Sequence, residues 1–204
     1  IITASTGIDA MVHAIEAFTS INSNNNPVSK MLSIEALKLL GSSIKTAVFD
    51  GHNINARSNM LLGSMLAGKA FANSPVAAVH ALAYPIGGLF NISHGLSNSL
   101  VLTSVMKFNS KNEETKKNYA HLAPYVFKNL DNSKNDEFLC NNFIDGLERL
   151  CKELNLPYRL RDLEIPEEAC KLMASEAMKQ TRLLVNNPRK IEESDAYNIY
   201  KSVW

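Results

Sequence analysis

Two residues near the start of the chain, Asp9 and His13, have the types and the spacing for metal chemistry. Because they are four positions apart, a helix places both on one face, where a carboxylate and an imidazole can bind one divalent ion. A second interpretation stays open at this point. Thr6 and Asp9 also have the spacing of a capping box, in which the carboxylate serves the start of a helix and His13 is a buried histidine hydrogen-bonded to Asp9.

A second pair of histidines, His80 and His94, lies in an otherwise apolar stretch. We expect Pro85 and the two glycines after it to end the helix that carries His80, and Ser93 to cap a helix that begins at His94. Such an arrangement can bring both imidazoles to one point, although each histidine alone also fits a satisfied core position. The two remaining histidines fit a turn and a solvated helix face: His52 and His121.

The elements that must position these side chains are predicted to be helical. Apolar residues recur at helical spacing along several segments, and a proline followed by two acids is typical of a helix first turn. One expected helix begins near Asn26–Pro27, with an apolar stripe of Val28, Leu32, Ala36, Leu39 and Leu40. Another is expected to begin at Ile165–Glu168. Three more are expected over about Ile54 to Asn73, Asp136 to Leu154 and Glu193 to Val203.

Strand signals are few. Leu100–Leu102 is a short apolar run for which a strand is not excluded, and the polar segments Asn22–Asn26 and Asp131–Asn135 predict loops. No repeat and no shift in composition marks a domain boundary. The sequence therefore predicts one all-α domain over residues 1–204, with about eight to ten helices.

Composition excludes several classes of protein. The 204 residues carry 21 basic and 20 acidic side chains, a net charge of +1, which gives no general electrostatic case for nucleic acid or an anionic membrane. No apolar run approaches the length of a membrane span. Three cysteines without metal-ligand spacing indicate buried thiols of a reducing, cytoplasmic compartment. The chain starts with isoleucine and has no leader pattern, so we expect it to be truncated or processed.

The sequence resembles the iron-containing (group III) alcohol dehydrogenases over essentially its whole length. The pattern Asp-x3-His followed by His-x13-His is, with its neighbouring residues, specific to that family. The stretches that carry the resemblance are Thr3–Phe18, Leu66–Pro75, Val79–Leu102 (with Pro85, Gly87, Gly95 and Asn98) and Asn186–Arg189.

The resemblance implies a fold and a ligand set. The fold is the helical C-terminal domain of the dehydroquinate synthase-like and iron-alcohol dehydrogenase type. The implied ligands of one Fe²⁺ or Zn²⁺ ion are Asp9, His13, His80 and His94, and three nitrogens with one oxygen suit either metal. The metal would polarise an alcohol or carbonyl oxygen during hydride transfer with NAD(P).

The resemblance also implies what lies beyond this chain. Family members have an N-terminal α/β domain that binds NAD(P), and no phosphate-binding glycine turn occurs here, so no cofactor-binding residue is assigned. The implied partners are this absent domain, a small alcohol, aldehyde or ketone and, we expect, further copies of the protein. Phe71 matches a position that lines the substrate pocket, and it equally fits an aromatic residue of the core. Tyr84 stands where some members carry a histidine, and its place four positions after His80 makes it a second candidate for the substrate pocket. A tyrosine is a poor base near neutrality, which puts a proton relay there in doubt and leaves packing as its expected role.

Two other classes of function are weighed against the dehydrogenase. An HD-type metal-dependent hydrolase would need a His-Asp dipeptide, and Gly95 follows His94 instead. A non-catalytic helical interaction domain would purify without a stoichiometric metal ion, so metal analysis separates it from the dehydrogenase.

Overall fold

The computed structural model describes residues 1–131 and 133–204, and in these residues it contains helices and no strand, which confirms the all-α prediction. The helices are α1 (Ile2–Thr19), α2 (Pro27–Phe49), α3 (Ile54–Asn73), α4 (Ala78–Phe90), α5 (His94–Asn109), α6 (Glu113–Val126), α7 (Asp136–Glu153), the short 3-10 helix η1 (Leu160–Leu163), α8 (Ala169–Met178), α9 (Thr181–Leu184) and α10 (Glu193–Ser202).

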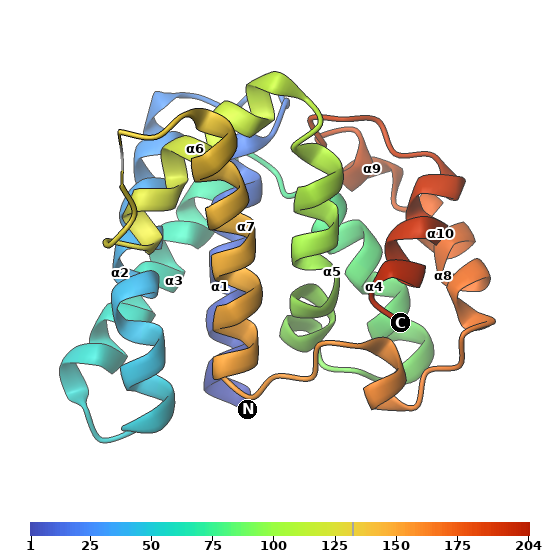
Figure 1. The fold of residues 1–204 in the computed structure, drawn as a ribbon, viewed down its shortest axis with the longest axis horizontal. Helices are drawn as coiled ribbons and strands as arrows, with labels where there is room; N and C mark the ends of the chain where they lie inside the picture. Colours follow the sequence, from blue (N-terminus) through green and yellow to red (C-terminus); the bar gives the residue numbers. More distant parts are fainter. Residues whose placement is uncertain (132) are drawn as a thin grey trace.

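Helix α1 is the central element of the fold. It packs against α2 and α3 on one side and against α5 on the other, while α4 pairs with α5 and with α8. Figure 1 shows α2, α3 and α6 on one side of α1, and α4, α5 and α8–α10 on the other. Helix α1 is buried over most of its length, as expected for a helix enclosed by its neighbours.

Local sequence explains several helix boundaries. Four helices begin at an asparagine whose side-chain oxygen accepts a backbone N–H of the first turn, as N-caps do; these are α2, α3, α6 and α7, with Asn26, Asn53, Asn112 and Asn135. Apolar residues recur at helical spacing along the predicted helix Asp136–Leu154, and they are buried in α7 and at its C-cap: Leu139, Phe143, Leu147, Leu150 and the C-cap Leu154.

Helix α4 is longer than predicted. Pro85 and the glycines at 87 and 88 lie inside it, and it ends at Phe90; the C-cap Asn91 has the left-handed φ of 56° typical of helix ends. The expectation that Pro85 ends the helix was wrong. The helix continues through Pro85, and tertiary packing surrounds this part of it: Pro85 and Ile86 are buried, and the buried Tyr200 hydroxyl donates a hydrogen bond to the Leu82 carbonyl (2.6 Å).

Other local predictions also need correction. Leu100–Leu102 is helical within α5, and Ile165–Glu168 precedes α8 as a turn. The predicted stripe of α2 is confirmed in part: Ala36 and Leu40 are buried, whereas Val28 at its start is 60% exposed. The loop at Asn22–Asn26 is confirmed. The loop at Asp131–Asn135 includes residue 132, which lies outside the described residues.

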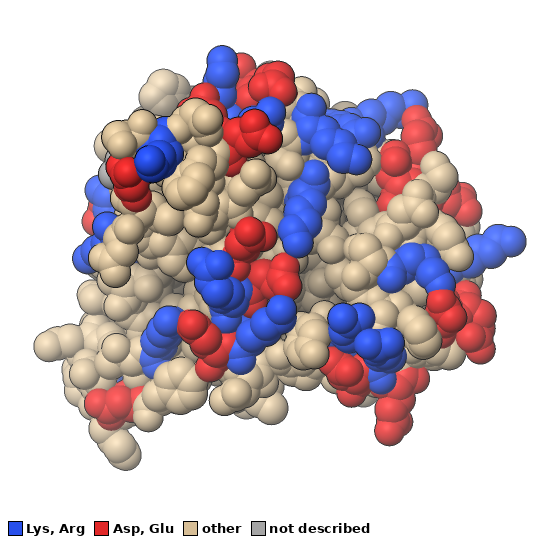
Figure 2. All heavy atoms as spheres, in the orientation of Figure 1, with Lys and Arg blue, Asp and Glu red and all other residues tan. Residues whose placement is uncertain are grey.

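Surface charge and hydropathy agree with the balanced composition. On the face drawn in Figure 2, Lys and Arg side chains are interspersed with Asp and Glu. Among the described helices, none is long and apolar enough to cross a membrane. Cys140, Cys151 and Cys170 are all free and buried, as predicted.

Candidate metal centre

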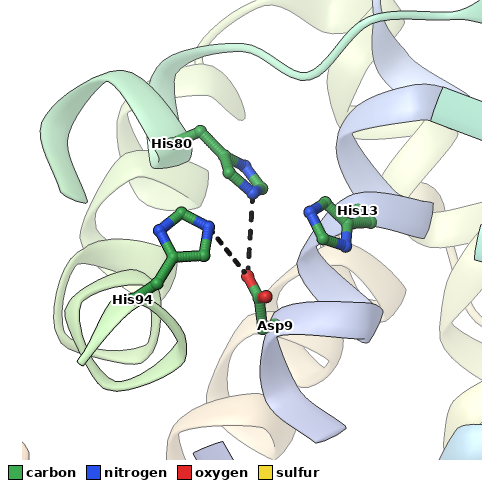
Figure 3. A group of neighbouring side chains, drawn as sticks. All are labelled: Asp9, His13, His80 and His94. Carbon is green, nitrogen blue, oxygen red and sulfur yellow. Dashed lines mark ion pairs between the residues drawn. The ribbon is translucent and has the colours of Figure 1, made fainter. Parts of the chain in front are cut away.

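Three helices place the four candidate ligands at one point. Helix α1 carries Asp9 and His13 on one face, α4 carries His80 in its first turn, and α5 begins with His94. Each residue offers one ligand atom, and these atoms all lie within 4.8 Å of one another. Figure 3 shows the four side chains pointing toward a common centre.

The alternative role of Asp9 as a capping residue is wrong. Helix α1 begins at Ile2, so both Thr6 and Asp9 lie inside it. The Thr6 hydroxyl donates to the Ile2 carbonyl (2.9 Å) and does not serve a helix start. Asp9 therefore has no capping function, and its carboxylate faces the histidines instead.

The distances within the cluster suit a bound ion. The Asp9 Oδ1 atom is 3.6 Å from His80 Nε2 and 3.7 Å from His94 Nε2, too long for hydrogen bonds. Two ligand atoms about 2.1 Å from a tetrahedral zinc ion would lie about 3.4 Å apart, which is close to these spacings. His80 Nε2 is buried and has no hydrogen-bond partner, so this nitrogen is free to offer a lone pair toward the cluster.

Two further polar side chains contact the ligands. Glu16 Oε2 lies 2.7 Å from His80 Nδ1, on the side of the ring opposite the cluster. The buried Asn98 amide donates to Asp9 Oδ1 (2.6 Å) and lies 3.2 Å from His94 Nε2. In the sequence, Asn98 was named only as part of the family resemblance and was given no function. No function was predicted for Glu16 either. The sequence feature that could have pointed to Glu16 is an acidic residue in an otherwise apolar helix, seven positions after Asp9.

The surroundings of His13 keep its ring neutral. Burial lowers the pKa of His13 to about 4, and the nearby carboxylate of Asp9 opposes this shift. Its ring stacks between Phe71 (centroid distance 4.6 Å) and His80 (4.7 Å). A neutral imidazole can offer a lone pair to a metal, so this environment favours the ligand form.

The two candidate pocket residues border the cluster. Phe71 is partly buried against His13, and Tyr84 is 36% exposed with its ring 5.7 Å from that of His94. His94 itself is 44% exposed, which makes this the open side of the cluster. The other two histidines lie elsewhere: His52 is in the turn before α3, and His121 is exposed on α6, both as predicted.

Fold and cluster together define a class: an all-helical domain with one aspartate and three histidines converging from three helices. The chain belongs to the Fe-containing alcohol dehydrogenase family; the C-terminal profile of that family matches residues 3–204. This membership confirms the resemblance and excludes the HD-type hydrolase.

Named relatives and solved structures agree with the family. The chain is 38% identical to long-chain-alcohol dehydrogenase 1 of Geobacillus thermodenitrificans, with 100% of this chain and 50% of that protein aligned. It matches a crystal structure of 1,3-propanediol oxidoreductase with a TM-score of 0.92 and 32% identity, over 98% of this chain and 51% of the other. It also matches sulfoacetaldehyde reductase from Bifidobacterium kashiwanohense in complex with NAD+, with a TM-score of 0.84 and 25% identity, over 99% and 50% of the two chains.

The chain therefore spans about half the length of the relatives that it matches.

Proposed function

We propose that this chain is the metal-binding catalytic domain of an NAD(P)-dependent alcohol dehydrogenase or carbonyl reductase. The observation that carries the proposal is the convergence of Asp9, His13, His80 and His94, with the buried His80 Nε2 left free toward the other three. The named activities of the relatives support the reaction class.

The four converging residues would hold one Fe²⁺ or Zn²⁺ ion. When bound, the ion would supply Lewis-acid polarisation of an alcohol or carbonyl oxygen, and a nicotinamide would supply the hydride chemistry. Asp9 contributes the only negative charge among the four ligands and so partly neutralises a dication. His13 is held by stacking on Phe71 and His80, and His80 is buried, whereas the exposed His94 borders the side from which a substrate oxygen can enter.

Phe71 and Tyr84 are proposed to line the substrate pocket. Phe71 offers an apolar surface next to His13 and excludes water from that side of the cluster. Tyr84 lies at the open side, with its ring near His94. Both side chains suit the carbon chain of a small alcohol, and Tyr84 is assigned packing, not proton transfer.

The rest of the full-length protein is proposed to supply an N-terminal domain that binds NAD(P). This is supported by the half-length match and by the NAD+ complex of the sulfoacetaldehyde reductase. A groove of about 450 Å³ beside α1 and α3, lined in part by Ile2, Ile54 and Leu61, offers apolar surface for that contact. A cytoplasmic location is supported by the free thiols, and self-association of the full-length protein stays a prediction.

The test uses the full-length protein and measures metal content, metal affinity and turnover of alcohols with NAD(P)+. We expect one Fe²⁺ or Zn²⁺ per chain and loss of turnover in a chelator. Asp9→Asn removes the only negative ligand, so its metal affinity should fall further than that of His94→Gln, which removes one neutral nitrogen. His52→Gln, outside the cluster, is the matched control. A wild-type protein that purifies and turns over without metal would contradict the proposal.

A further inference from the structure

Glu16 is a buried acid on the same face of α1 as the two ligands of that helix. It lies seven positions after Asp9 and three after His13, and it is 4% exposed. Among the described residues, its ion-pair contact is with His80 rather than with a lysine or arginine. A buried carboxylate requires hydrogen-bond donors, and three N–H groups of the segment that begins α4 supply them.

Two of these donors belong to the backbone at the start of α4. The Ala77 N–H donates to Glu16 Oε2 (3.0 Å), and the Val79 N–H donates to Glu16 Oε1 (2.6 Å). The N-cap residue of α4 is Ala77, which has no side chain able to cap. Glu16 thus caps α4 from a different helix, where the positive end of the helix dipole also favours its charge.

The third donor is His80, the third residue of α4. Its Nδ1 lies 2.7 Å from Glu16 Oε2. Because a carboxylate only accepts hydrogen bonds, His80 must carry a hydrogen on Nδ1. In a neutral ring this leaves Nε2 without a hydrogen, and Nε2 is the buried, unpartnered atom that faces Asp9.

We propose that Glu16 is the positioning residue of the metal centre: it holds His80 in the tautomer and ring orientation that present Nε2 as a ligand. The inference rests on the metal site proposed above. Because Glu16 also caps α4, one side chain both starts the helix that carries His80 and orients the His80 ring. Outer carboxylates that accept a hydrogen bond from a ligating histidine set metal affinity in this way.

The test variant is Glu16→Gln in the full-length protein. The glutamine side chain has one oxygen, and its NH2 group takes the place of the second carboxylate oxygen. That NH2 group must then face either a backbone N–H donor or His80 Nδ1. When it faces His80, it favours the tautomer with hydrogen on Nε2, which opposes metal binding. The matched control is Ser74→Ala: Ser74 is buried, and its hydroxyl ties the segment before α4 to the Ala17 carbonyl of α1 (2.6 Å) without contacting His80.

Zinc affinity, measured by competition with a chelator, separates positioning from mere stabilisation. We expect Glu16→Gln to weaken zinc binding by about 10- to 100-fold. Ser74→Ala should lower the melting temperature of the metal-free protein and leave zinc affinity unchanged. In a His80→Ala background, Glu16→Gln should weaken binding no further, because the effect acts through His80. Equal zinc affinity of wild type and Glu16→Gln, or additive losses in the double variant, would overturn the proposal.

A measurement on the wild type tests the same point without depending on the folding of any Glu16 variant. In metal-free, full-length protein labelled with 15N-histidine, the ring 15N shifts of His80 should report hydrogen on Nδ1 and none on Nε2. Hydrogen on Nε2 would overturn the positioning role of Glu16. A wild type that shows the expected tautomer but binds no zinc would instead refute the proposed function and the metal role that depends on it.

Discussion

Substituting Gly95 by alanine tests how closely two of the site's helices must approach. Gly95 follows His94 in the first turn of α5, where α5 meets α1. A Cβ at this position would lie 2.5 Å from the Ser5 carbonyl oxygen and 2.8 Å from its carbonyl carbon. Both atoms are backbone, so no side-chain rotation relieves the clash. The two helices must separate until this contact exceeds 3.0 Å, and an ordinary contact at this point needs 3.4 Å.

The magnitude follows from overpacking. Forcing a methyl group into a filled contact costs about 1–3 kcal/mol of folding free energy. Alanine in a helix returns at most about 1 kcal/mol relative to glycine, which, subtracted in full, leaves a net destabilisation of about 0–2 kcal/mol. The displacement is nearly an ångström and moves His94 relative to Asp9 and His13. We therefore expect metal affinity to fall by about 10-fold or more.

The assay compares urea unfolding in a chelator with zinc competition for full-length wild type, Gly95→Ala and Gly88→Ala. Gly88 lies in α4 with nothing within 4 Å of an added Cβ, so its alanine variant should be slightly stabilised, by about 0.5–1 kcal/mol, with unchanged zinc affinity. If Gly95→Ala is as stable as wild type and binds zinc equally well, the close approach of α1 and α5 does not hold the site together.

Two predictions concern other parts of the fold. Burial raises the pKa of the Cys140 thiol to about 11 and that of the Cys151 thiol to about 12. Alkylation of these two thiols in the folded protein at pH 8 should therefore be at least about 100-fold slower than in urea. Fast alkylation of the folded protein would contradict their burial. Because these pKa values are raised, the stability that the protonated thiols contribute is present below pH 9 and lost as pH rises toward 11–12, which alkaline melts will detect. Asn187→Ala removes a reciprocal amide pair with buried Asn109 (2.8 and 2.9 Å) and should destabilise the fold by about 1–3 kcal/mol in urea unfolding; an unchanged midpoint would refute this.

Helices α2, α3 and α7 were predictable because each has a local signal, whereas no span was predicted from the sequence for α1 or α6. The apolar stripe of α7 matches its buried face, and Asn26 and Pro27 mark the start of α2. The continuation of α4 past Pro85 was not predictable from local signals, because the contacts that surround it, such as the hydrogen bond from Tyr200 to Leu82, come from residues more than one hundred positions away in the chain.

In the candidate site, too, local contacts could be predicted from the sequence and contacts between distant segments could not. The spacing of Asp9 and His13 predicts a shared face from the helical period alone. The approach of His80 and His94 to that face depends on how α4 and α5 pack against α1, and the family resemblance, not the spacing, supplied it. The contacts of Glu16 could not be predicted from the sequence, because they join α1 to backbone groups some sixty residues later.

The most direct test of the central claim is anomalous X-ray diffraction at the zinc or iron edge from crystals of the metal-loaded, full-length protein. We predict one strong anomalous peak per chain, with an oxygen of Asp9 and one nitrogen each of His13, His80 and His94 about 2.0–2.2 Å from it. A peak held by other residues, or metal-loaded crystals without a peak among these four side chains, would contradict the account.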